Sequence, residues 1–219
     1  MAQLKYGVIG LGFFGEKHLE VLTTIPGVEV AGICTRTRSK LDAIAQRFKI
    51  KNTYTDYHEL LRNPEITAVS IVTHVNEHLN PTIAALAAGK HVFLEKPMAA
   101  TLSECDEIIR ASEKTNKFLM IGHICRFDPR YATAKKEIAD GKLGKLVSLY
   151  ARRNLPAKVS AAVLTKISPL FGDGIHDTDL MLWFTGDKIK TVYARTVSVR
   201  KLPNPDLGWA MYQFAGGTI

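Results

Sequence analysis

Three glycines near the amino terminus have the spacing that holds a pyrophosphate group. Gly10, Gly12 and Gly15 form a G-x-G-x-x-G turn between an apolar run, Leu4–Ile9, and a helical pattern. In such a turn one glycine allows a tight bend, one lets a ligand approach the backbone, and one lets the helix pack on the strand. The exposed amides and the dipole of the helix then stabilise negative charge. The turn predicts a dinucleotide site that includes the residues inside it, Phe13 and Phe14.

Arg36 and Arg38 follow the second predicted strand, Val28–Cys34, together with Thr35. Folds that select NAD usually place an acidic residue here, where it accepts a hydrogen bond from the ribose 2′-hydroxyl. A carboxylate would repel a 2′-phosphate, whereas arginine binds phosphate through paired, charge-assisted hydrogen bonds. These residues favour NADP as the cofactor and leave NAD open. An ordinary basic loop after a strand is the alternative interpretation.

Polar side chains also follow a third predicted strand, residues 68–72. Thr73, His74 and His78 could line the nicotinamide side of the crevice at the carboxyl edge of a parallel sheet. His78 could equally stand at the start of a helix and make a structural hydrogen bond.

A Glu95-Lys96-Pro97 triplet ends the next predicted strand, His91–Leu94, at the same edge. A lysine there can donate to a substrate hydroxyl or, if burial depresses its pKa, help to move a proton. Pro97 could fix the loop, with a cis peptide as one means. From the triplet alone, a surface Glu–Lys pair is the better interpretation.

His176 precedes an apolar helix in the carboxy-terminal half. A histidine at such a point suits a general base, because its unperturbed pKa lies near physiological pH. Asp177 and Asp179 suit helix capping and the helix dipole, so structural roles are expected for them. No further ligand for a metal stands in an obvious place, and no metal is expected.

Strands and helical patterns alternate through the first half of the chain, which predicts a parallel sheet covered on both faces. The predicted strands are Leu4–Ile9, Val28–Cys34, 68–72, His91–Leu94 and 118–122. The predicted helices are 15–24, 39–48, 57–63, 80–88 and 102–116, with Ser39 and Thr101 as helix caps. The fold class is α/β, a Rossmann-type doubly wound sheet, and we place this domain at residues 1–122.

The pattern changes near Phe127, and we place a second domain at residues 123–219. Helices are predicted at 129–140 and 176–184, and strands at 145–153, 191–199 and 209–214, with a polar, proline-punctuated segment up to Asp173. The final residues look like a hairpin turn whose second strand has just begun. A sheet stopping there would have an unpaired edge, so we expect either a fragment or a sheet completed by another subunit.

Composition excludes several classes of protein. The chain has 219 residues, 46% hydrophobic and 23% charged, as in an ordinary globular protein. No apolar run approaches the ~18 residues of a membrane span and no signal peptide is recognised, so we expect a cytoplasmic protein with no membrane partner. The basic residues behind the net charge of +8 are scattered, which argues against nucleic-acid binding. Cys34, Cys105 and Cys125 fit neither a disulfide framework nor a zinc site.

Together, these motifs resemble those of the glucose–fructose oxidoreductase / inositol dehydrogenase / MocA (Gfo/Idh/MocA) family of NAD(P)-dependent oxidoreductases. The resemblance covers essentially the whole chain, and the combination of motifs is specific although no single motif is. The matching residues are the glycine turn with His18, Ala87-Ala88-Gly89-Lys90-His91-Val92 leading into Glu95-Lys96-Pro97, Gly122-His123 with Arg126-Phe127, and Gly174-Ile175-His176 with Asp179.

The resemblance implies a Rossmann domain followed by an α/β domain with a large, open, mainly antiparallel sheet, here partial because relatives continue beyond Ile219. That sheet commonly forms the oligomer interface, so a homo-oligomer is expected. The implied activity is hydride transfer between NAD(P) and a hydroxyl or carbonyl carbon of a sugar or cyclitol. The implied substrate-site residues are Lys96, Arg126 and His176, with Glu95 beside the cofactor.

By the same resemblance, His176 would take the hydroxyl proton while Lys96 orients the substrate oxygen. Two positions depart from the family's pattern. Gly172 stands where an aspartate is frequent, with the candidate Asp173 one residue closer to the histidine, and His74 stands where proline is frequent. These departures and the short second domain motivate an alternative, a non-catalytic NADP-binding sensor or partner-binding module.

Overall fold

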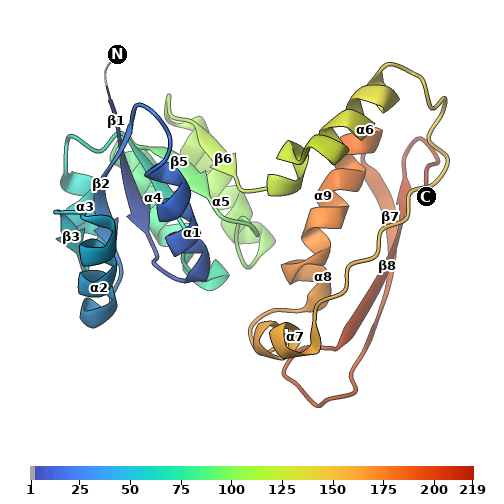
Figure 1. Cartoon of the computed structure of the whole chain (residues 1–219). Helices are drawn as coiled ribbons and strands as arrows, with labels where there is room; N and C mark the ends of the chain where they lie inside the picture. Colours follow the sequence, from blue (N-terminus) through green and yellow to red (C-terminus); the bar gives the residue numbers. More distant parts are fainter. Residues whose placement is uncertain (1–2) are drawn as a thin grey trace. The chain divides into compact units, whose positions relative to one another are not determined.

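The computed structural model describes residues 3–219, and these residues form two compact units (Figure 1). One unit ends at Gly122, and the other runs from His123 to Ile219. Both combine helices with a sheet, and the α/β fold class is confirmed. No helix within residues 3–219 is both long and apolar enough to cross a lipid bilayer. The cytoplasmic location stays a prediction.

The first unit is built on a six-stranded sheet in the order β3-β2-β1-β4-β5-β6, with every neighbouring pair parallel. This order is that of a doubly wound sheet. Its strands are β1 (Leu4–Ile9), β2 (Val28–Cys34), β3 (Thr53–Tyr54), β4 (Ala68–Ile71), β5 (His91–Leu94) and β6 (Leu119–Ile121). The short β3 was not predicted, because two residues carry no detectable alternation of apolar and polar side chains.

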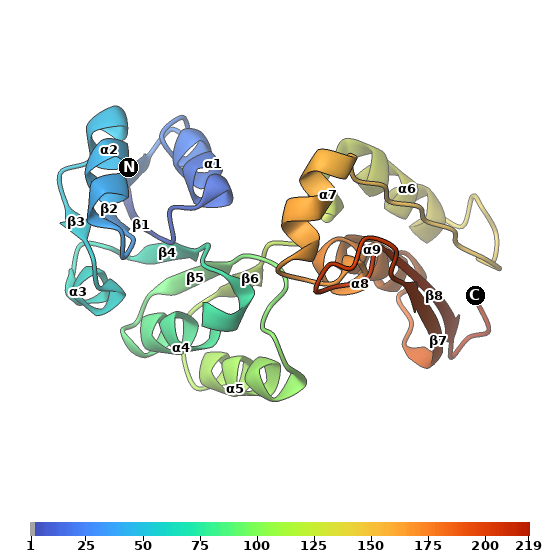
Figure 2. The same cartoon turned by 90° about the horizontal axis from the view of Figure 1, so that it is seen from below.

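Helices cover both faces of this sheet, as Figure 2 shows, with α1 and α2 on one side and α3, α4 and α5 on the other. Each side has its own apolar core, centred on Leu19 and Leu41 or on Leu60, Leu86 and Ile108. The helices are α1 (Phe13–Leu22), α2 (Arg38–Phe48), α3 (Tyr57–Arg62), α4 (Leu79–Ala87), α5 (Leu102–Glu113) and the 3-10 turn η1 (Val75–Glu77).

Two predicted helix caps have different outcomes. Thr101 forms a capping box with Glu104, in which each side chain accepts a hydrogen bond from the other residue's backbone amide. Ser39 is not a cap, because α2 begins one residue earlier, with Thr37 at the capping position and no capping hydrogen bond from its side chain.

Lys90 is an unusual buried lysine in the first unit. Only 6% of the residue is exposed, and its Nζ donates to the carbonyl oxygens of Asn63 and Ile66 at 2.8 and 2.7 Å. Burial lowers the pKa of this amine. The side chain ties the start of β5 to the connection between α3 and β4.

The second unit holds helices against a two-stranded antiparallel sheet of β7 and β8. Its helices pack on one face, where Gly208 of β8 meets Leu170 and Thr178 lies 2.9 Å from the Tyr212 hydroxyl. The elements are η2 (Ile124–Phe127), α6 (Pro129–Ala139), α7 (Ala157–Leu164), α8 (Pro169–Gly172), α9 (Gly174–Thr185), β7 (Ile189–Val197) and β8 (Leu207–Phe214).

Two predictions for this unit were wrong. Residues 145–153 form no strand. Their backbone meets Ile219 through two hydrogen bonds, from the Leu149 amide to the Ile219 carbonyl and from the Ile219 amide to the Val147 carbonyl, which are too few for a ladder. The proline-punctuated segment contains the helices α7 and α8, and its prolines Pro156 and Pro169 stand at their starts, where proline is compatible with a helix.

Candidate functional site

The glycine turn is shaped by contacts that exclude side chains at two of its three glycines. Gly10 has a φ of +93°, and a Cβ there would lie 2.6 Å from the Val72 carbonyl. A Cβ on Gly15 would lie 2.0 Å from the Gly10 carbonyl oxygen, so the helix and the turn are in direct backbone contact. Only glycine fits either position.

Gly12 differs, because no described atom lies within 4 Å of the position its Cβ would take. It is the residue before α1, and no side chain caps this helix, so the first amides of α1 are not used by a capping side chain. Phe13 and Phe14 are exposed beside it. The backbone is therefore open to a ligand at Gly12, and the residues fit a pyrophosphate group.

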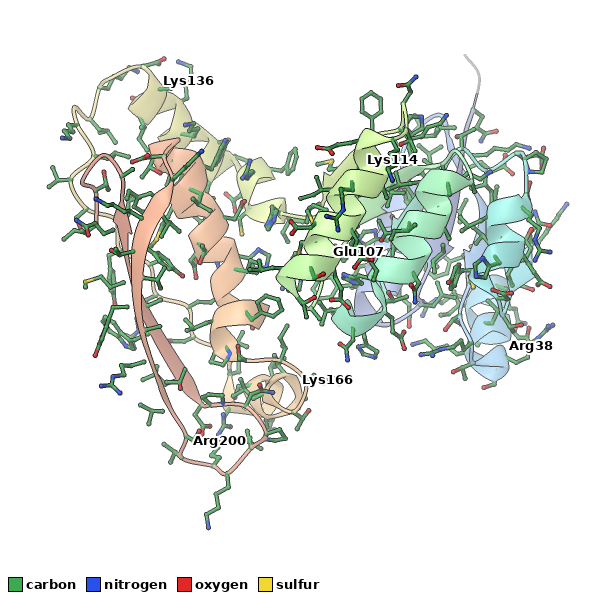
Figure 3. All side chains as sticks on the ribbon, turned by 180° about the vertical axis from the view of Figure 1, so that it is seen from behind. Arg38, Glu107, Lys114, Lys136, Lys166 and Arg200 are labelled. Atoms are coloured by element: carbon green, nitrogen blue, oxygen red, sulfur yellow. The ribbon has the colours of Figure 1, made fainter. Side chains whose placement is uncertain are left out.

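The arginines after β2 are paired with carboxylates. The Arg36 guanidinium donates to Glu77 at 2.6 Å, and Arg38 donates to both oxygens of Asp42 at 3.0 and 3.1 Å. Both arginine side chains are well exposed, and Figure 3 shows Arg38 at the surface of α2. Thr35 donates its amide to the Tyr54 carbonyl. Glu77 was missed because it lies 41 residues after Arg36.

His78 is buried, and its contacts favour the structural alternative. It is 1% exposed, with Nδ1 2.9 Å from the Pro97 carbonyl and Nε2 3.2 Å from the Thr73 carbonyl. Burial lowers the pKa of the imidazole, although both carbonyls favour the proton. His74, by contrast, is exposed before η1.

Glu95 is buried and not part of a surface pair. It is 9% exposed, and its Oε1 lies 3.1 Å from Nε2 of His18, whereas its Oε2 accepts the Lys96 amide at 3.2 Å. Lys96 is half-buried, and the Lys96–Pro97 peptide is cis. The sequence pattern contains His18 but gave no role for it.

In the second unit, α9 gathers the remaining candidates. His176 and Asp179 lie one helical turn apart and are both buried, whereas Asp173 immediately precedes the helix. Asp179 accepts two hydrogen bonds from Arg126, at 2.9 and 2.6 Å, and its carboxylate holds the pKa of that guanidinium above its ordinary value. The predicted capping role of Asp179 is therefore wrong, because its place is in the helix interior.

Arg126, predicted to bind substrate, uses two of its donors on Asp179 and lies over the Trp183 ring at 5.7 Å. The neighbouring Asp177 also accepts two hydrogen bonds, from Arg153 at 3.1 and 2.8 Å. Asp179 therefore ties the 3-10 turn η2 to α9, and Asp177 ties the segment around Arg153, which has no regular secondary structure, to the same helix. These partners, 53 and 24 residues away, could not be read from the sequence.

Known proteins match both units. Residues 4–123 match the model of the Gfo/Idh/MocA family, which is described as "Oxidoreductase family, NAD-binding Rossmann fold". Residues 131–219 match the model of the GFO/IDH/MocA C-terminal domain. The inositol 2-dehydrogenase of Salmonella typhimurium is 32% identical over 192 residues, which cover 86% of this chain and 56% of that protein. The myo-inositol 2-dehydrogenase of Thermotoga maritima is 30% identical, with 87% of this chain and 58% of that protein covered.

The structure of scyllo-inositol dehydrogenase from Lactobacillus casei with bound NAD(H) and scyllo-inositol matches with a TM-score of 0.91 at 27% identity. The match covers 99% of this chain and 67% of that one. This chain thus spans a little more than half the length of the curated relatives named above.

Proposed function

We propose a hydride-transfer reaction for this chain, which belongs to the Gfo/Idh/MocA family of NAD-binding oxidoreductases. The hydride passes between a nicotinamide dinucleotide and a hydroxyl or carbonyl carbon of a cyclitol or sugar. The observation that carries the proposal is the open backbone at Gly12 beside the uncapped start of α1. The names of the relatives, inositol dehydrogenases, support a cyclitol as the first substrate class to test.

A bound nicotinamide supplies the hydride acceptor or donor. The amides of the glycine turn and of α1 would hold the pyrophosphate of the cofactor. In the oxidative direction, His176 takes the substrate's hydroxyl proton on its imidazole, the carbinol carbon loses hydride, and a carbonyl forms. The role assigned to the Lys96 ammonium is to donate a hydrogen bond to a substrate oxygen, whose developing charge it would stabilise. In the reductive direction His176 returns the proton.

NADP preference is the finer part of the proposal. The support for it is the pair of guanidiniums at the end of β2, which could bind a 2′-phosphate through charge-assisted hydrogen bonds once Arg36 leaves Glu77 and Arg38 leaves Asp42. Because both ion pairs lie at the surface, breaking them costs little free energy.

We also propose a homo-oligomer formed through the outer face of β7 and β8. Cross-strand pairs on this face bring Tyr193 opposite Met211 and Val197 opposite Leu207, and Trp209 is exposed beside them. Arg195 pairs with Trp209 on the same face, so the exposed side chains are mainly apolar with one charge among them, and a second copy would cover them. Light scattering of the protein and of a Trp209→Glu variant tests this, and a monomer in both would refute it.

The function is tested first by calorimetric titration with NADH and with NADPH, and then by nicotinamide absorbance with a panel of inositols and sugars. We expect binding and an absorbance change that Lys96→Met and His176→Ala each reduce by about a hundredfold or more. Turnover that survives both substitutions would contradict the assignment.

One observation favours the alternative, a non-catalytic NADP-binding sensor. A Cβ at Gly172 would lie 2.7 Å from Ile167 Cγ2, so this position is crowded where the family often has an aspartate. Cofactor binding without any absorbance change across the panel would support the sensor.

A further inference from the structure

His18 and Glu95 form a buried pair that reaches from the glycine turn to the Lys96 loop. His18 belongs to α1, which the turn begins, whereas Glu95 directly follows β5. Their contact at 3.1 Å is largely shielded from solvent, because the two side chains are only 17% and 11% exposed. A carboxylate this far from water needs polar partners, so the contact is a strong constraint on both side chains.

The other nitrogen of His18 fixes the orientation of the imidazole. Nδ1 lies 3.0 Å from Oγ of Ser70 in β4, and that oxygen lies 3.2 Å from the Tyr6 hydroxyl in β1. Phe93 adds an edge-to-face ring contact at 5.3 Å. With contacts on both ring nitrogens and on its side, the imidazole has one orientation, and that orientation holds Glu95.

Glu95 is fixed from a second direction as well. Its Oε1 lies 3.1 Å from where a Cβ on Gly122 would be, so the carboxylate packs closely against the backbone after β6. Its Oε2 accepts the amide of Lys96. The peptide that carries the Lys96 side chain is therefore bonded to a carboxylate whose place is set by α1 and by the sheet.

We propose that His18 and Glu95 are a positioning pair, which holds the Lys96 peptide at a fixed distance from the glycine turn and so aligns its ammonium group with a dinucleotide bound there. In this role the pair acts through Lys96 and needs no contact of its own with substrate or cofactor. The catalytic part of this inference rests on the proposed function, whereas the structural part does not. Misplacing a catalytic group by about 1 Å costs roughly a hundredfold in rate, so a positioning pair has a measurable effect.

The structural part is tested by hydrogen exchange of the Lys96 amide, followed by NMR in the protein without nucleotide. We expect His18→Leu and Glu95→Ala to speed this exchange by about tenfold or more, because its acceptor is displaced or lost. His18→Gln retains a side-chain donor for Glu95 and should restore slow exchange. His58→Leu, at an exposed histidine of α3, is the matched control and should change nothing.

The catalytic part is tested with the same variants. We expect His18→Leu to lower kcat by about tenfold or more, with the Kd for NADH changed by less than about threefold, and His18→Gln to recover most of kcat. Exchange at Lys96 within about twofold of the parent protein in folded His18→Leu and Glu95→Ala would overturn the inference. A parent protein without turnover would overturn the proposed function, and the exchange data would still decide the pair.

Discussion

The two units of the chain are stabilised in different ways. The first has two apolar cores inside its own sheet and helices. Among the described residues of the second unit, only Leu164, Leu180 and Phe214 are buried apolar side chains, and large apolar side chains are exposed on its outer sheet face. Charged pairs join its segments instead: Arg126 with Asp179, Arg153 with Asp177, and Arg200 with Asp206 across the β7–β8 loop.

The difference shows where each unit is sensitive to change. Close packing makes the first unit intolerant of added volume, whereas buried charge makes the second unit intolerant of a lost partner. The two can be followed separately, because both tryptophans, Trp183 and Trp209, belong to the second unit. Tryptophan fluorescence therefore reports on the second unit, and amide exchange of β1 and β4 reports on the first.

The largest expected effect comes from Gly15→Ala. The added Cβ would lie 2.0 Å from the Gly10 carbonyl oxygen, and we expect the first unit to lose about 3 kcal/mol or more of stability and its nucleotide binding. Amide exchange in β1 measures this, with tryptophan fluorescence unchanged. Gly12→Ala is the matched control, because its Cβ would meet open space. We expect this variant to bind NADH about tenfold more weakly while the first unit stays folded. Equal stability of the Gly15→Ala and Gly12→Ala variants would contradict the expectation that only Gly15 is too crowded for a side chain.

Next in size is Arg126→Ala in the second unit. It leaves the buried Asp179 carboxylate without its bidentate partner, and we expect a loss of about 2 kcal/mol, since the arginine itself is partly exposed. Urea unfolding followed by tryptophan fluorescence measures it. Arg126→Lys keeps one charge and should lose less. A midpoint that does not move for Arg126→Ala would contradict the idea that charged pairs stabilise this unit.

An effect of pH should appear in the first unit through His78. Burial lowers the pKa of its imidazole, so below the ordinary pKa the unfolded chain binds this proton more readily than the folded chain does. Stability is then fully present above pH ~6.5 and falls as the pH drops below it, with a limiting slope of about 1.4 kcal/mol per pH unit. Exchange in β4 measured from pH 5 to 8 should show a shallower slope for His78→Gln than for the exposed control His74→Gln. Parallel slopes would contradict this assignment.

The smallest effect is expected at the exposed Arg36–Glu77 pair. Glu77→Gln frees Arg36, and because a surface ion pair contributes up to about 1 kcal/mol, the ratio of NADPH to NADH affinity should rise by about threefold. Calorimetry with both nucleotides measures the ratio. Asp42→Asn frees Arg38 in the same way and shows which arginine matters. A ratio unaffected by either change would weaken the proposed 2′-phosphate site.

Local patterns were sufficient for most of the first unit. β1, β2 and β5 have the predicted bounds, because each is an apolar run ended by a glycine or a polar residue. The capping box at Thr101 is equally local. The extended segment 145–153 was mistaken for a strand, because strand formation depends on a neighbouring ladder and not on its own residues.

The candidate site was predictable only as a set of residue types. The glycine turn and the Glu95-Lys96 loop follow from spacing and from the edge of the sheet. The partners of Glu95, Asp179 and Arg36 lie 77, 53 and 41 residues away, and no periodicity connects such positions. His78 shows the same limit, because its burial against Pro97 depends on how two loops pack.

The reactivity of Lys90 can report on local opening of the first unit. Its amine is enclosed by the carbonyls of Asn63 and Ile66, so an acylating reagent can reach it only while the connection between α3 and β4 is open. The burial that lowers the pKa of this amine ends when the amine is released, so the released amine reacts as an ordinary exposed lysine. Mass spectrometry gives the rate at which Lys90 becomes acylated. This rate therefore measures how often the connection between α3 and β4 opens while the rest of the molecule stays folded.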